Sequence, residues 1–202
     1  MTHVFTGSIG ILVLGSLALA QTPPPEADPF TVERAFSEGG KVALQLASGD
    51  YTVRAGASDR IVVRWTPDHD ARLRDVHDLT VSVRVTGRSG IVVTAGKTNH
   101  MDFVIELPAR SDLHLRIRAG DIRLQGIDGH KDIRMTAGDL RIGVRRETLG
   151  SAHASVTFGD LDARALGISK SGIKRSLDWF GGGDYELDAR LGAGDLTLAE
   201  IR

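Results

Sequence analysis

Aspartate residues at related positions along the chain are the first candidates for catalytic groups. Asp121, Asp139 and Asp160 each follow a glycine, and Arg141 stands close to the second of them. Two carboxylates held roughly 5 to 9.5 Å apart serve as the acid and the base or nucleophile of glycoside hydrolases. On neighbouring strands these aspartates, together with Arg141, would suit a polysaccharide lyase or hydrolase. A carboxylate bonded to its own turn is a poor acid, so we expect no catalytic residue here.

A cation bridging these aspartates is the second chemistry to consider. Calcium-binding repeats use a nine-residue Gly-Gly-x-Gly-x-Asp period, which this sequence lacks. Short carboxylates after a glycine commonly accept hydrogen bonds from nearby turn amides. We therefore predict that each aspartate bonds to the amides of its own turn, with no metal and no cofactor.

The Gly-Asp pairs mark sharp bends between short apolar-alternating segments. Across most pairs the apolar residues change from odd-numbered to even-numbered positions, or the reverse. Before Gly120 the odd positions 113 to 119 are apolar, and after it the even positions 122 and 124 are apolar. A strand has a period of two, so a switch indicates that the chain turns a corner. We assign this structural role to five pairs: Gly49 and Asp50, Gly120 and Asp121, Gly138 and Asp139, Gly159 and Asp160, and Gly194 and Asp195. A sixth pair is Gly183 and Asp184.

The spacing of the bends predicts the fold class. The bends at Gly120, Gly138 and Gly159 are roughly 20 residues apart, too close for strand-helix-strand units. The favoured interpretation is an all-β protein, a β-solenoid or β-helix-like stack of short strands. A β-sandwich would also give alternating strands with regular turns, and it stays open as the alternative.

Arginines recur at fixed offsets from the bends. Arg116 and Arg134 precede a bend by four residues, and Arg123 and Arg141 follow one by three. If the strands stack in register, these side chains form a basic stripe for an anionic polymer, such as a polysaccharide or a lipid headgroup layer. The alternative is that they are ordinary solvated charges paired with Asp121, Asp139 and Asp162.

Residues 167–183 interrupt the repeat with basic residues followed by Trp179 and Phe180. We expect a long hairpin or loop whose aromatic side chains cover an open sheet edge or pack on a flank. The other interpretation is a binding platform, because an exposed tryptophan can stack on a sugar ring.

Composition bounds what the chain can do. Its 202 residues, 41% hydrophobic and 25% charged, suit one ordinary globular domain. A formal net charge of −1 argues against a generic nucleic-acid binder, and the lack of cysteine excludes disulfides and thiolate chemistry. The sequence contains no nucleophile elbow, phosphate loop or dinucleotide fingerprint.

The N-terminal segment predicts export. Residues 9–20 are apolar and end in Ala18-Leu19-Ala20, the small-residue pattern that signal peptidase prefers. We assign residues 1–20 to a signal peptide, 21–29 to a proline-rich linker, and 30–202 to a β-strand-repeat domain with an insertion near 167–183. No membrane span is expected in the mature chain.

Two further motifs are short and polar. His69 and His77 lie near aspartates in a segment that we interpret as a solvated loop. Ser171 and Lys174 match an S-x-x-K pattern, but the partner motifs of penicillin-interacting enzymes are missing, so we expect no nucleophile there.

The segment from Leu107 to Leu113, followed by AGDIRLQGIDG and TAGDLRIGV, resembles the bacterial putative-adhesin family of β-strand-repeat proteins. The closing YELDARLGAGDLTL is similar to the end of that family, and the resemblance covers most of residues 36–198, most strongly 107–165. It implies a β-solenoid-like, exported envelope protein without established catalytic activity, and it defines no functional residues.

These observations favour a non-enzymatic, exported cell-envelope protein that is adhesin-like or a scaffold for interactions. The alternative is a polysaccharide-active or polysaccharide-binding β-helix protein. The expected location is periplasmic, cell-surface or secreted. The expected partner is an envelope polysaccharide or another surface protein rather than nucleic acid, and self-association is open.

Overall fold

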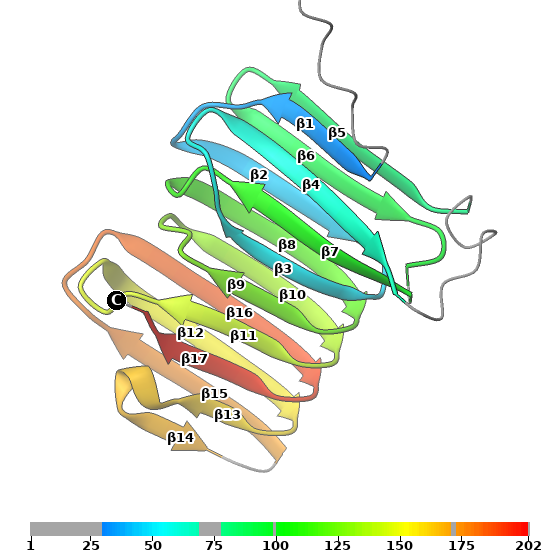
Figure 1. Ribbon diagram of the computed structural model, residues 1–202. Coiled ribbons are helices and arrows are strands. Elements are labelled where there is room, and N and C mark those ends of the chain that lie inside the picture. The colour runs from blue at the N-terminus through cyan, green and yellow to red at the C-terminus, as the bar shows by residue number, and fades with distance from the viewer. Residues whose placement is uncertain (1–29, 69–77, 99, 171–172, 202) are drawn as a thin grey trace, which may run out of the picture.

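In a computed structural model that describes residues 30–68, 78–98, 100–170 and 173–201, the chain folds as two mixed β-sheets (Figure 1). The nine-stranded sheet contains, in spatial order, β1 (Thr31–Ala35), β4 (Arg60–Pro67), β7 (Met101–Leu107), β3 (Asp50–Ala55), β9 (Ile122–Gln125), β11 (Leu140–Val144), β17 (Leu196–Glu200), β13 (Leu161–Ala163) and β14 (Ile168–Lys170). The eight-stranded sheet contains β15 (Ile173–Phe180), β12 (Leu149–Phe158), β16 (Tyr185–Ala193), β10 (Lys131–Ala137), β8 (Ser111–Ala119), β2 (Gly40–Leu46), β6 (Ser89–Ala95) and β5 (Thr80–Thr86). A single 3-10 turn, Arg164–Leu166, is the only helical element in these described ranges.

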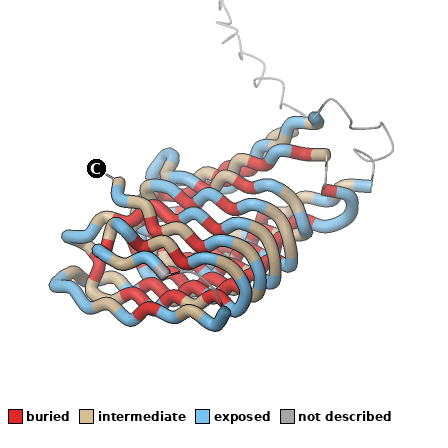
Figure 2. Tube along the Cα trace, turned by 90° about the horizontal axis from the view of Figure 1, so that it is seen from below, coloured by how far each residue is buried: buried red, intermediate tan, exposed pale blue. Residues whose placement is uncertain are grey.

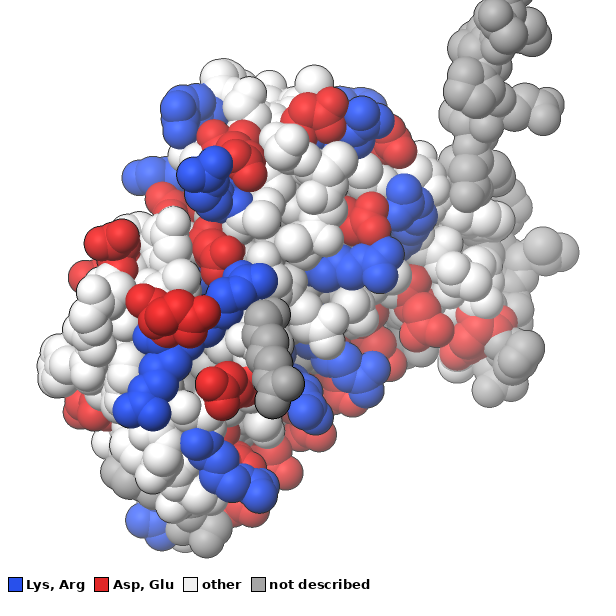
Figure 3. Space-filling model, turned by 60° about the vertical axis from the view of Figure 1, so that its left-hand side comes forward, with Lys and Arg blue, Asp and Glu red and all other residues white. Residues whose placement is uncertain are grey.

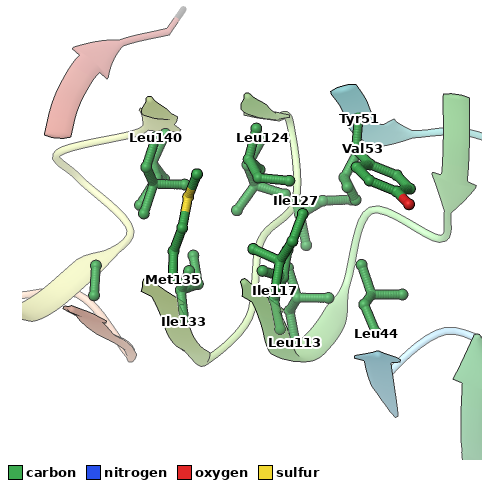
Figure 4. Packing of buried hydrophobic residues seen from close by; sticks show 14 of the residues in the cluster. Leu44, Tyr51, Val53, Leu113, Ile117, Leu124, Ile127, Ile133, Met135 and Leu140 are labelled. Atoms are coloured by element: carbon green, nitrogen blue, oxygen red, sulfur yellow. The ribbon is translucent and has the colours of Figure 1, made fainter. Parts of the chain in front are cut away.

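The two sheets face each other across one apolar layer. Alternating residues of each strand point inward, and Figure 2 shows buried positions lining the space between the sheets. Leu44 and Ile133 from the eight-stranded sheet point toward the opposite sheet, where Val53 and Leu140 face them (Figure 4). Burial of these aliphatic side chains stabilises the fold because it removes apolar surface from water.

The repeating unit is a strand of the eight-stranded sheet, a bend, and a strand of the other sheet. Five units contain a Gly-Asp bend: β2 with β3, β8 with β9, β10 with β11, β16 with β17, and β12 with β13. Neighbouring units pair in parallel and in register: Ile133 on β10 lies opposite Leu115 on β8 and Ala189 on β16. The all-β prediction is therefore confirmed, and the bends stack as the parity switches indicated.

The order of the stack differs from the order of the chain. The unit of β16 and β17 comes last in the sequence. In space it lies between the unit of β10 and β11 and the unit of β12 and β13. At the other end β6 and β7 lie outside β2 and β3. The units therefore do not follow chain order at either end of the stack. The physical reason is that parallel partners need only matching bends and matching apolar parity, which are nearly the same in every unit.

Antiparallel strands close each end of the stack. β5 pairs with β6, and β4 and β1 extend the nine-stranded sheet beyond β7. The insertion at 167–183 supplies the opposite end, because β14 pairs with β13 and β15 pairs with β12. The described part of the insertion therefore forms edge strands. The signal peptide and linker assigned to residues 1–29 lie outside the described residues, as do His69 and His77.

Glycine is required at the bends for two reasons. The backbone angle φ lies between 110° and 132° at Gly120, Gly138, Gly159 and Gly194, a range that residues with a side chain rarely adopt. A Cβ atom on Gly138 would also collide with the carbonyl oxygen of Gly120, and a Cβ atom on Gly120, Gly159 or Gly194 would collide with the carbonyl oxygen of the adjacent bend glycine in the same way. The sixth pair stands apart, because the Gly183 amide bonds to the Leu149 carbonyl instead, at 3.2 Å.

Replacing one stacked glycine tests this constraint. Gly138→Ala is expected to lower the free energy of unfolding by at least about 2 kcal/mol, because the backbone conformation and the collision both oppose a Cβ. Gly182→Ala is the matched control, since no atom lies within 4 Å of its added Cβ, and it is expected to change stability by less than about 0.5 kcal/mol. Urea denaturation measures both. Equal effects of the two substitutions would contradict the stacked bend.

Candidate functional site

The aspartates of the bends form one hydrogen-bonded column. The amide of Asp121 donates to Asp50 Oδ1, and the amide of Asp139 donates to Asp121 Oδ1, both at 3.2 Å. Asp195 donates to Asp139 at 3.2 Å, and Asp160 to Asp195 at 3.1 Å. Four of the five carboxylates thus accept the amide of the neighbouring bend and not that of their own turn, which corrects the sequence-based expectation for Asp121 and Asp139.

A hollow of about 230 Å³ lies along the column and is lined by Asp121, Asp139, Asp195, Arg123 and Arg141 among others. Its carboxylate Oδ1 atoms are already committed to backbone amides. Over the described residues there is no cluster of three or more histidine, cysteine, aspartate and glutamate side chains that could hold a metal ion. Through the hydrogen bonds to these Oδ1 atoms, the column links each bend to the next.

A ladder of alternating charges crosses the outer face of the eight-stranded sheet. Asp132 on β10 lies 2.8 Å from Arg116 Nη2 on β8 and 2.7 Å from Arg134 Nη1. Asp188 on β16 continues it, at 2.9 Å from Arg134 and 3.2 Å from Arg190. The paired-charge interpretation of Arg116 and Arg134 therefore holds, with Asp132 and Asp188 as partners instead of the aspartates of the bends.

Each central arginine of the ladder is fixed by the same set of bonds. Arg116 Nη1 donates to the carbonyls of Leu115 and Asp132, and Arg134 Nη1 donates to those of Ile133 and Asp188. The pKa of Asp132 is lowered: burial raises it, but the hydrogen bond from Arg116 and the surrounding positive charges outweigh the burial. The ladder therefore holds the guanidinium groups of Arg116 and Arg134 in place.

A groove of about 1010 Å³ lies beside the ladder on the same face. It crosses β6, β2, β8, β10, β16 and β12, and its lining includes Ala47, Thr136, Gly192 and Thr157, with small side chains. Arg116, Arg118, Arg134 and Arg190 also line it. Six strands about 4.8 Å apart give a length of roughly 24 Å. This groove is the candidate binding site; the sequence placed Arg116 and Arg134 in one column but gave no sign of a hollow.

Arg123 and Arg141 lie on the opposite face of the molecule. They are in register on β9 and β11, in the nine-stranded sheet, with Thr52 and Thr197 on the flanking strands. The four arginines singled out from the sequence therefore form two separate pairs, one on each sheet. Elsewhere, on the side shown in Figure 3, basic and acidic side chains are interleaved and form no single-signed patch.

The two aromatic residues of the insertion have different surroundings. Trp179 packs against the core, with the Arg146 guanidinium 5.8 Å above its ring. Phe180 is 74% exposed and lies edge-on to His153, with ring centroids 6.0 Å apart. Only Phe180 is thus presented to solvent as a binding platform requires, and neither residue lines the groove.

Lys131 is a buried cation that the sequence analysis did not single out. It begins β10 at an inward position, opposite Leu113 and Leu187, and is only 7% exposed. Its Nζ donates to the Gly129 carbonyl at 2.9 Å. Burial lowers the pKa of Lys131 to about 8, although Asp128 and Asp112 oppose the shift. The signal available in the sequence was a lysine at the parity of the apolar positions.

The fold has solved counterparts. No family model matches the sequence, and no curated protein matches it either. A putative cell adhesion protein from Clostridium sporogenes superposes with a TM-score of 0.51 at 9% identity, over 85% of this chain and 99% of that one. A putative adhesin from Parabacteroides merdae aligns over 85% of this chain and 95% of its own, at 9% identity and a TM-score of 0.29.

Only the first of these superpositions is close enough to support an argument, and at 9% identity it supports the fold alone. The resemblance to putative adhesins predicted from the repeats is thus confirmed as a likeness of structure. No helix among the described residues has the length and apolar character needed to cross a bilayer.

The ladder predicts that the free energy of unfolding falls at acidic pH. Because the folded pKa of Asp132 lies below the ordinary value of about 3.9, its contribution is complete above that pH and is lost as the pH falls below it. Asp132→Asn is expected to be less stable at pH 7 and to lose less stability between pH 5 and pH 2, roughly the range over which carboxylates titrate. Chemical denaturation at several pH values measures this, with the exposed Asp184→Asn as control. The same slope in Asp132→Asn and wild type would contradict the ladder.

Lys131 predicts a second range, in alkali, over which stability rises with pH. Between pH 8 and pH 10, roughly, the unfolded chain keeps the lysine proton that the folded chain releases, so stability is expected to rise with pH. Lys131→Met is expected to raise stability at pH 7 and to remove that rise. Lys41→Met, at an exposed position on β2, is expected to leave it unchanged. A rise that persists in Lys131→Met would show that another group causes it.

Proposed function

We propose that this chain is a non-enzymatic, exported protein of the cell envelope, adhesin-like in role, built on a solenoid-like stack of β-strands. In this proposal the eight-stranded sheet presents its outer groove to a polymer or protein at a cell surface. Export rests on the apolar segment and cleavage pattern of residues 1–20. The fold shared with a putative cell adhesion protein supports the adhesin-like role.

The groove itself is the observation that carries the proposal. It has a volume of about 1010 Å³ and extends over six strands whose backbones are fixed by parallel ladders. Recognition on such a surface needs no ordering of loops, which lowers the entropic cost of binding. A long shallow groove across a sheet suits an extended ligand better than a small metabolite, which prefers an enclosed pocket.

The alternative of a polysaccharide-active enzyme rests on the aspartate column. Those carboxylates accept hydrogen bonds from neighbouring amides, which ties them to the backbone. A general acid or base must be free to reach the atom that it protonates or deprotonates. We therefore prefer the binding scaffold.

Blocking the groove tests this function. Thr136 is exposed in the middle of the groove, on β10, and Thr136→Tyr fills the groove while keeping a residue that favours strands. We expect the chain from residue 21 onward to bind members of a glycan array or intact bacterial cells, and Thr136→Tyr to lose this binding. Thr86→Tyr, at an exposed threonine on β5 outside the groove, is the control. Binding that both variants retain would place recognition elsewhere.

A further inference from the structure

The groove on the eight-stranded sheet has charge of a single sign. Arg116, Arg118, Arg134 and Arg190 line it, and no aspartate or glutamate is among the lining residues that the structure describes. The two carboxylates of the ladder, Asp132 and Asp188, line a separate hollow of about 600 Å³ on the other side of the arginines. The groove therefore presents guanidinium groups, and the carboxylates that pair with three of them line the neighbouring hollow.

Two kinds of arginine contribute. Arg116 and Arg134 are held by the ladder, which engages Nη1 and Nη2; in the described contacts their Nε atoms take no part. Arg118, two residues beyond Arg116 on β8, is exposed and forms no hydrogen bond or ion pair with any described residue. The groove thus combines fixed guanidinium groups along one side with a free guanidinium group within it, and arginine is well matched to carboxylates.

Hydroxyl groups and aliphatic side chains, Leu46, Val93, Ile117, Met135 and Leu191 among them, make up most of the remaining lining, and none of the described lining residues has an aromatic ring. Ser48, Thr136, Ser155 and Thr157 line the groove, and no phenylalanine, tyrosine or tryptophan does so. Hydroxyl side chains can both donate to and accept from the hydroxyl groups of a sugar. Single-stranded nucleic acid depends on aromatic side chains for stacking, which this groove does not offer. A peptide cannot add as a strand here, because the backbone groups of the central strands are already paired in the sheet.

We propose that the groove binds an acidic polysaccharide, a polymer whose sugar units carry carboxylates, lying across the strands along the stack. Its carboxylates bond to Arg118 and to the Nε groups of Arg116 and Arg134, while its hydroxyls meet the serine and threonine side chains. This inference rests on the proposed function and adds the ligand class. Charge complementarity selects this occupant over a neutral glycan.

Polygalacturonate tests the ligand class, and its fully methyl-esterified form is the neutral control on the same backbone. We expect the wild-type chain to bind polygalacturonate in a calorimeter, more weakly at high salt, and to bind the esterified polymer far less. Arg118→Glu is expected to weaken binding by about tenfold or more, because it removes a charge-assisted bond and repels the polymer. Arg141→Glu makes the same change at an exposed arginine on the opposite sheet and should leave binding within about twofold.

Several results would overturn the inference. Equal loss in Arg118→Glu and Arg141→Glu would show diffuse attraction to the whole surface. Equal binding of the esterified polymer, or binding only to vesicles containing phosphatidylglycerol, would exclude acidic polysaccharide as the ligand. A neutral glycan or a cell surface that binds the wild type but not Thr136→Tyr would leave the proposed function intact while this ligand class fails. Circular dichroism of each variant checks that it is folded.

Discussion

The structure depends on how closely consecutive bends approach each other. At Gly120, Gly138 and Gly194 there is no space for a Cβ atom, because the carbonyl of the adjacent bend occupies it. The carboxylates of Asp50, Asp121, Asp139 and Asp195 complete the column by accepting the amide of the next bend. One dipeptide therefore fixes both the direction of the turn and the spacing between units. Registration of the strands on both sheets follows from that column.

The outer groove is a consequence of this registration. Once bends stack, residues at one offset from the glycine line up across strands, as Arg116, Arg134 and Arg190 do on β8, β10 and β16. The same alignment brings Asp132 and Asp188 next to them and allows the charge ladder to form. The side chains two residues closer to the bend are mostly small, and a hollow remains above them. A long recognition surface can thus arise from a short repeated pattern.

The sequence predicted the parts of the fold that depend on local chemistry. The parity switches identified the bends, because a period of two cannot change sides without an extra residue. The order of the units was beyond this reasoning, since β16 and β17 carry the same bend and apolar pattern as the units they separate. The partners of Arg116 were also misassigned. Asp132 lies on the adjacent strand and pairs through register, which local spacing does not reveal.

The most direct test of the account is a measurement of which bends touch. In an NMR spectrum of the labelled chain, nuclear Overhauser contacts between the backbone protons of bend residues report on adjacency. The account predicts contacts from Asp139 to Asp195 and from Asp195 to Asp160, following the hydrogen bonds of the column. Direct contacts between Asp139 and Asp160, as in a simple winding order, or no contacts between bends, would contradict it.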